Sequence, residues 1–117
     1  MRQLIKVFKA LSDETKIRIL KILQERKELC VCEIMQALNI SQSRASRNLG
    51  ILKDAGFVID KRNGLWVHYS INKKMVNKYH EPINKLMKNW LNNESIIRED
   101  RKRLKKVVKL SEKNRCK

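Results

Sequence analysis

The sequence predicts a mainly α-helical domain with one small β-hairpin, and three observations support this prediction. Amphipathic segments with helical periodicity fill most of the 117 residues. Two β-rich runs, Phe57–Lys61 and Trp66–Ile71, flank an Asn63–Gly64 pair that is typical of a tight hairpin turn. Two short helices joined by a tight turn precede this hairpin. The expected fold is therefore a winged helix-turn-helix.

Four helices are expected before the hairpin, and short polar residues mark their ends. Ser12 is placed to cap the second helix and Ser41 to cap the fourth, because a serine side chain accepts hydrogen bonds from the first helical turn. Asn39 and Gly56 end the third and fourth helices, since both tolerate a left-handed conformation. The expected ranges are 2–10, 13–26, 32–38 and 41–55.

Two more helices are expected after the hairpin. Pro82 favours a helix that begins near Glu81, because proline is tolerated in a first turn and poorly in an interior. Residues 73–80 are interpreted as a turn or short helix, and the last helix is expected over 95–110. We expect a single domain over 2–111, with dimerisation helices at both ends, and a frayed basic tail over 112–117.

The charge favours a polyanionic partner. Lysine and arginine number 28 against 12 acidic residues, which gives a net charge of +16. Nucleic acid is the first candidate and an anionic membrane surface the second. No apolar run is long enough to span a bilayer and no secretory signal is evident, so a cytoplasmic location is expected. The sequence shows no phosphate-binding glycine loop and no nucleophile–base set, which argues against an enzyme.

The fourth helix is the candidate for reading DNA, because such a helix contacts bases through its N-terminal turns. Glutamine and asparagine can pair with adenine, and arginine with guanine. The hairpin adds basic residues beside its glycine tip. The predicted DNA-binding residues are Ser41, Gln42, Ser43, Arg44, Ser46, Arg47 and Asn48 on the helix, and Lys61, Arg62 and Asn63 on the hairpin. No cofactor is expected for DNA binding.

A homodimer is expected, because two apolar stripes lack an obvious partner within the chain. Two-fold symmetry would place the two reading helices about one DNA turn apart, on a palindromic operator. The expected interface residues are Leu4, Ile5, Phe8, Ile83, Leu86, Met87, Trp90 and Leu91.

Several segments together resemble the ArsR/SmtB family of metal-responsive repressors. They are Phe8–Asp13 with Thr15–Leu20, Glu28–Glu33, Ser41–Gly56, and the hairpin with Trp66–Tyr69. The segment around Cys30 and Cys32 resembles the metal-binding box of arsenic, antimony and cadmium/lead sensors. The chain departs from the family pattern at Asn48, where histidine is usual, and at Met35, where arsenic sensors often hold a third cysteine.

The resemblance implies that Cys30 and Cys32 bind a thiophilic ion that releases the DNA. Soft thiolates select soft ions, and a trigonal As(III) or Sb(III) site needs fewer ligands than tetrahedral zinc. Arsenite is therefore the first candidate inducer. Cadmium or lead on the same pair, and thiol oxidation, remain alternatives. Cys116 is a candidate third ligand, from either subunit.

The spacing of this pair predicts how ion binding would act. On an ideal helix, residues two apart point about 200° away from each other. Chelation by both sulfurs therefore requires the chain around Val31 to leave helical geometry. The affected helix directly precedes the reading helix, so ion and DNA would weaken each other's binding.

Overall fold

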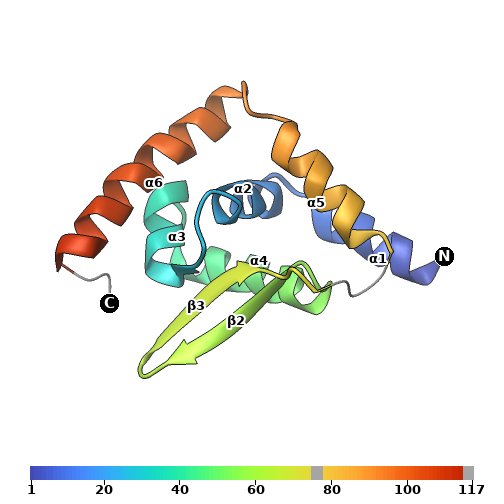
Figure 1. Ribbon diagram of the computed structural model, residues 1–117, viewed down its shortest axis with the longest axis horizontal. Coiled ribbons are helices and arrows are strands. Elements are labelled where there is room, and N and C mark those ends of the chain that lie inside the picture. Colours follow the sequence, from blue (N-terminus) through green and yellow to red (C-terminus); the bar gives the residue numbers. More distant parts are fainter. Residues whose placement is uncertain (75–77, 115–117) are drawn as a thin grey trace.

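The computed structural model describes residues 1–74 and 78–114, without the side chains of 111–114. Among the described residues, five helices and a small sheet surround the central helix α2 (Figure 1). In chain order the elements are α1 (Arg2–Leu11), α2 (Glu14–Leu23), β1 (Leu29–Cys30), α3 (Val31–Leu38), α4 (Gln42–Asp54), β2 (Val58–Asn63), β3 (Trp66–Ile71), α5 (His80–Asn89) and α6 (Ser95–Asn114). The winged helix-turn-helix prediction is confirmed.

The turn between α3 and α4 forms as its residues predict. Asn39 ends α3 in the left-handed conformation, at φ 55°. The Ser41 hydroxyl caps α4 by accepting a hydrogen bond from the backbone N–H of Arg44. Gly56 follows α4 with φ 85°, a value that favours glycine.

The capping prediction for α2 is wrong by one residue. The carboxylate of Asp13, and not the hydroxyl of Ser12, accepts a hydrogen bond from the first turn of α2. The Ser12 hydroxyl instead donates to the carbonyl of Lys9 and so closes the end of α1. The helix α2 also ends at Leu23, three residues before the expected Arg26.

The sheet has one more strand than the sequence indicated. Its order is β1-β3-β2, and both strand pairs are antiparallel. The short β1 pairs Leu29 with Tyr69 and Cys30 with His68. Asn63 pairs with Trp66, so the hairpin turn is Gly64–Leu65 and lies one residue later than expected.

One apolar core joins the helix-turn-helix to the rest of the chain. The inner faces of α2, α3 and α4 meet there, and the start of the wing covers one side. Fully buried members include Ile19, Leu20, Leu23, Ile34, Leu38, Leu49, Leu52 and Phe57. The reading helix therefore has a fixed inner face, and its outer face is left to solvent.

The two helices after the wing differ from their predicted ends. The helix α5 begins at His80, and Trp90 and Leu91 lie beyond its end, where Leu91 has φ 68°. The helix α6 continues to Asn114, past the expected Leu110, and packs along α3 (Figure 1). It overlaps the start of the tail predicted to fray, and residues 115–117 lie outside the described part. None of the described helices is long and apolar enough to cross a membrane.

Candidate DNA-binding surface and cysteine box

The first two turns of α4 present a polar face to solvent. Ala45 and Leu49 are buried on the inner side of this helix. The predicted residues that lie exposed on its outer side are Ser41, Gln42, Ser43, Arg44, Ser46 and Arg47. Among them, Gln42, Arg44 and Arg47 have side chains that can reach a base edge or a phosphate.

Asn48 does not lie on this face, which differs from the prediction. It is buried, and its side-chain amide donates to the carbonyl of Arg44. Arg44 itself is partly engaged within the protein, because its Nη2 donates to the hydroxyl of the buried Thr15 at 2.7 Å. This contact links α4 to α2. Gln42 and Arg47 are therefore the long exposed side chains for which no contact within the described residues competes.

The wing extends the basic surface beyond α4. Lys61, Arg62 and Asn63 are exposed on β2 and lead to the Gly64–Leu65 turn. The ammonium of Lys53, in the last turn of α4, contacts the Asp60 carboxylate on β2 at 3.0 Å. This exposed ion pair contributes little stability, but it joins the wing to the reading helix.

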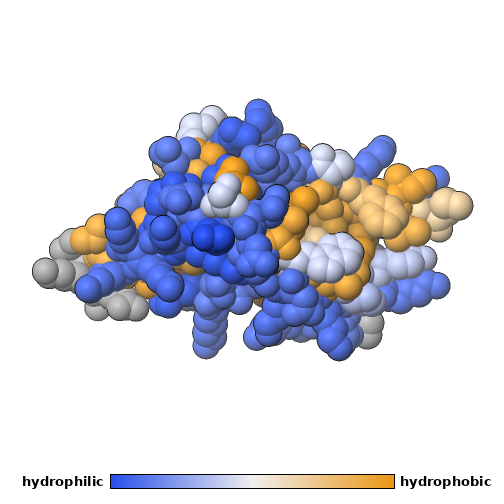
Figure 2. Space-filling model, turned by 90° about the horizontal axis from the view of Figure 1, so that it is seen from above, coloured by the Kyte–Doolittle hydropathy of each residue, from blue (hydrophilic) through white to orange (hydrophobic). Residues whose placement is uncertain are grey.

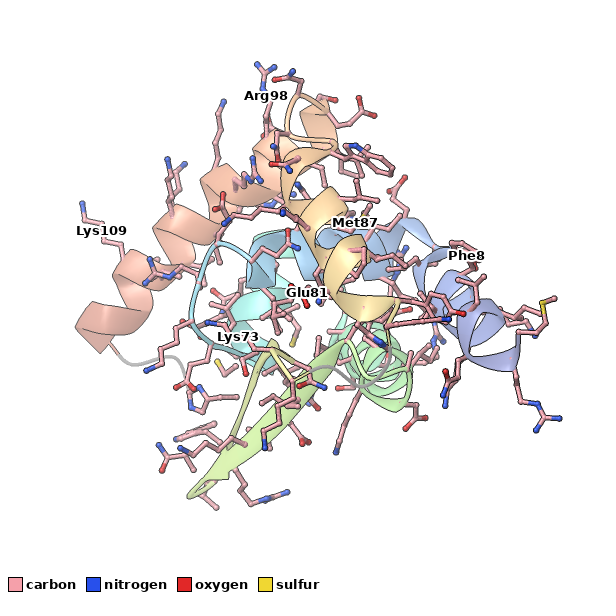
Figure 3. The ribbon with its side chains drawn as sticks, turned by 45° about the vertical axis from the view of Figure 1, so that its right-hand side comes forward. Phe8, Lys73, Glu81, Met87, Arg98 and Lys109 are labelled. Carbon is pink, nitrogen blue, oxygen red and sulfur yellow. The ribbon has the colours of Figure 1, made fainter. Side chains whose placement is uncertain are left out.

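Apolar side chains gather at the end of the molecule that carries α1 and α5 (Figures 1 and 2). Phe8 is 58% exposed and Trp90 53%. Figure 3 shows Phe8 on the outward side of α1. The expected interface residues Ile5, Leu86 and Leu91 are also exposed, whereas Leu4 and Ile83 are half-buried. Met87 is buried within the chain, so it is part of the core and not of this face.

The two cysteines of the box lie at the junction between β1 and α3. Cys30 occupies the N-cap of α3 with an extended backbone, at φ −81° and ψ 163°. Cys32 lies in the first turn of α3, and its sulfur accepts a hydrogen bond from the Gln36 amide at 3.0 Å. The chain thus leaves helical geometry at Cys30. Because Cys30 is not helical, the two side chains are not forced to point in opposite directions, as they would be on an ideal helix.

The two cysteines differ in burial, because Cys30 is buried and Cys32 is half-buried. Cys30 is only 4% exposed and lies opposite His68 on β3. Its backbone N–H donates to the carboxylate of Glu33, which anchors the start of the helix. Burial raises the pKa of the Cys30 thiol, although the nearby backbone N–H groups of Glu33 and Cys32 oppose this effect. Cys30 is therefore held as a protonated thiol at neutral pH.

Within residues 1–74 and 78–114, no three cysteine, histidine or acidic side chains converge as a metal site would require. Cys30 and Cys32 lie two residues apart, and no third soft ligand joins them within the described residues. Cys116, the third ligand expected from the sequence, lies outside the described residues. The described part of the chain therefore supplies an incomplete set of soft ligands at the start of α3.

Sequence reasoning missed two buried charges that fix the helices around this site. The ammonium of Lys21 is fully buried and donates to the carbonyls of Met87 and Trp90 at 2.6 Å and to the Asn92 side chain at 2.7 Å. Asp100 on α6 is also fully buried and pairs with Arg18 on α2. Lys21 lies among apolar residues of its helix and Asp100 among charged ones, and neither pattern indicates a partner so far away in sequence.

The sequence is similar to those of known bacterial regulatory proteins. The profile of the bacterial regulatory protein, arsR family, matches residues 13–60. The chain is 47% identical over 75 residues to the arsenic resistance transcriptional regulator ArsR2 of Pseudomonas putida, covering 64% of this chain and 65% of that protein. It is 44% identical to the arsenical resistance operon repressor of Escherichia coli, over 58% of each chain. The Bacillus subtilis repressor of the same description is 34% identical over 66% of this chain and 73% of its own length.

Solved structures show the same architecture. The homodimeric winged helix-turn-helix DNA-binding domain of a possible ArsR-family regulator from Mycobacterium bovis superposes with a TM-score of 0.63 at 28% identity, covering 75% of this chain and 77% of that one. The antimony-specific transcriptional repressor AntR superposes with a TM-score of 0.58 at 26% identity, covering 71% of both chains.

These matches concern the helix-turn-helix and its surroundings. The chain spans from about half to just under two thirds of the length of the first three curated relatives it matches, at 65%, 58% and 54%. The family profile ends at residue 60 and includes Cys30, Cys32 and the whole of α4. On the identity to these regulators and the shared fold, the chain belongs to the arsR family of bacterial regulatory proteins.

Proposed function

We propose that this protein is a homodimeric, cytoplasmic DNA-binding repressor that leaves its operator when trivalent arsenic or antimony binds Cys30 and Cys32. One observation supports this proposal above the others. The soft ligand pair lies at the N-terminus of α3, which is the first helix of the helix-turn-helix itself. A ligand bound there acts directly on the element that supports the reading helix.

The exposed face of α4 supplies the contacts to DNA. Gln42 and Arg47 reach base edges in the major groove, and the hydroxyls near the N-terminus of α4 contact phosphates. Lys61 and Arg62 on the wing contact the backbone beside the groove. Because Asn48 is buried, the set that reads DNA is smaller than the sequence indicated.

The apolar face on α1 and α5 is the dimer interface. Phe8 and Trp90 are large apolar side chains that a monomer would expose to water, at a cost in free energy. A second copy of the chain covers this face, as in the homodimeric Mycobacterium bovis relative. The two-fold axis then presents both α4 helices to a palindromic operator.

The chemistry of the inducer suits two thiols. Arsenous acid, As(OH)₃, exchanges each hydroxide for a cysteine sulfur, and the thiol proton leaves with the hydroxide as water. Two As–S bonds thus release two waters, and no electron is transferred. Cys116 is the proposed third thiol, which would replace the last hydroxide and release a third water.

Ion binding reaches the DNA surface through the start of α3. An ion that contacts both sulfurs must uncover Cys30, which is buried against β3. This movement disturbs the hydrogen bond between the Cys30 N–H and Glu33 and shifts α3 against α4. A coupling of about 3 kcal/mol would weaken operator affinity about 150-fold.

The test is arsenite titration of a complex between the protein and a fluorescein-labelled duplex, selected by the wild-type protein from a randomised pool. Arsenite should lower the anisotropy to that of free DNA. The variants Cys30→Ser and Cys32→Ser should bind the duplex and resist release. Retention of DNA by the wild-type protein at saturating arsenite would refute the proposal.

The pH dependence separates arsenite from cadmium. Exchange of thiols on As(OH)₃ releases water and no net proton, so its affinity should change little between about pH 6 and pH 8. Binding of Cd²⁺ to two thiols releases two protons, so its affinity should rise about 100-fold per pH unit. Release by cadmium alone, with that steep dependence, would assign the site to a divalent metal.

A further inference from the structure

A buried ion cluster joins the last helix to the turn of the helix-turn-helix. The Asp100 cluster consists of Arg18 on α2 and Asp100 and Arg103 on α6. Asp100 accepts hydrogen bonds from the Nε and Nη2 atoms of Arg18 and from Nη2 of Arg103, each at 2.8 Å. Asp100 is fully buried and Arg18 is 7% exposed, so these charges depend on one another for compensation.

Both arginines also bind the end of α3. Nη2 of Arg18 donates to the carbonyl of Leu38, and Nε of Arg103 donates to the carbonyl of Ala37, both at 2.8 Å. The last carbonyls of a helix lack partners within the helix and carry partial negative charge. The two guanidinium groups therefore supply the hydrogen bonds that the C-terminus of α3 needs, and Asp100 orients both of them.

The carbonyls that they bind lie beside the α3–α4 turn. Leu38 is followed by the left-handed Asn39, and Ser41 caps α4 two residues later. The angle between α3 and α4 is thus set next to the Asp100 cluster. The apolar residues Leu104 and Val108 of α6 join the same core, so α6 is packed along α3 as well as bonded to it.

We infer that Asp100 is a positioning residue for DNA reading: through Arg18 and Arg103 it holds the α3–α4 turn in the arrangement that directs α4 at the bases. The family profile ends at residue 60, so α6 lies outside the part of the chain that the profile matches. The inference requires that α4 reads DNA, as proposed above, but not that arsenic releases it.

The variant Asp100→Asn tests this inference. The amide offers one oxygen instead of two and turns N–H donors toward the guanidinium groups, which leaves Arg18 buried without a counter-ion. Affinity is measured, without arsenite, for a duplex selected by the wild-type protein and for the same duplex with its sequence scrambled. We expect affinity for the selected duplex to fall at least about tenfold and affinity for the scrambled duplex to be unchanged.

Glu99→Gln is the matched control, because it removes the same charge from the exposed neighbour of Asp100 on α6. It should leave both affinities as in the wild type. Loss of folding would lower both affinities together, whereas a misdirected α4 lowers the affinity for the selected duplex alone. A folded Asp100→Asn variant that keeps wild-type discrimination between the two duplexes overturns the inference.

A milder variant decides the question if Asp100→Asn does not fold. Arg103→Gln removes the hydrogen bond to Ala37 and keeps the Arg18–Asp100 pair, and Lys102→Gln is its charge-matched control. Discrimination should fall in Arg103→Gln and not in Lys102→Gln. Equal discrimination in these two variants overturns the inference. A wild-type protein that selects no sequence from the pool would instead overturn the proposed function, and the inference with it.

Discussion

Replacement of Lys21 by methionine should weaken the whole assembly, because Lys21 fastens the end of α5 to α2. Its ammonium is fully buried and donates to the carbonyls of Met87 and Trp90 and to the Asn92 side chain, at 2.6, 2.6 and 2.7 Å. Methionine has a similar volume and fills the space of the lysine side chain, so no large cavity forms. The three acceptors, however, lose their donor.

The cost follows from these contacts. Hydrogen bonds to a charged group contribute about 1.5–3 kcal/mol each, and three of them would give about 4.5–9 kcal/mol. Burial of the ammonium opposes this gain, as shown by the lowered pKa of Lys21, which burial causes with a smaller contribution from Arg101. The net loss expected for Lys21→Met is about 3–4 kcal/mol, because each of the three buried acceptors left without a donor costs about 1 kcal/mol or more.

The assay is urea unfolding followed by circular dichroism at one fixed protein concentration, because the stability of a dimer depends on concentration. Lys88→Met, on the exposed side of α5, is the control and should change the free energy of unfolding by less than about 0.5 kcal/mol. A loss below about 1 kcal/mol in the free energy of unfolding of Lys21→Met would refute the reasoning. The three hydrogen bonds would then only offset the cost of burying the ammonium.

Three further predictions follow from the surfaces and the cysteine box. Phe8→Glu should give a monomer at micromolar concentration in analytical ultracentrifugation, whereas Ile59→Glu, an equally apolar exposed position on β2, should leave the dimer intact. Under reducing conditions Cys30 should be the slowest cysteine to react with iodoacetamide, because burial raises its pKa above the ordinary 9.0, and its rate should keep rising with pH beyond that value. Mass spectrometry of the labelled peptides measures these rates, and labelling of Cys30 as fast as that of the other cysteines would contradict its burial. Neutralising Lys61 and Arg62 should reduce the slope of log affinity against log salt concentration by about 0.9 per lost phosphate contact, whereas neutralising Lys105 and Lys106 should not, because α6 lies outside the helix-turn-helix and the wing; an equal reduction would place α6 on the DNA.

The local fold could be predicted because local residues determine it. Asn39, Ser41 and Gly56 each have a conformational preference or a capping group that acts within a few residues. The wing likewise forms from the two β-rich runs on either side of Asn63–Gly64. The error at the start of α2 is of one residue, because the neighbours Ser12 and Asp13 offer the same capping chemistry, whereas the errors at helix ends are larger.

The contacts between distant residues could not be predicted. Arg18 and Asp100 are 82 positions apart, and nothing in the spacing of either helix distinguishes a buried charge from a solvated one. The same holds for Asn48, which lies on a polar stretch of sequence but faces inward. The short β1 escaped notice because two residues are too few for periodicity, and it exists only because β3 pairs with it.

A run of basic residues lies on the outer face of α6. The exposed basic residues Arg98, Lys102, Lys105, Lys106 and Lys109 form one face, and Figure 3 shows Arg98 and Lys109 pointing away from the body of the protein. The buried face holds Leu104, Val107 and Val108. What the sequence left open is that this buried face packs on α3, beside the helix-turn-helix turn.

The central claim is that an ion at Cys30 and Cys32 loosens the start of α3. Hydrogen–deuterium exchange of the peptide over residues 28–40, measured on DNA-free protein with and without arsenite, tests it most directly. Faster exchange in the first turn of α3 on addition of arsenite, with α5 unchanged and no effect in Cys30→Ser, is the predicted result. Bound arsenite together with unchanged exchange in that turn would contradict the account.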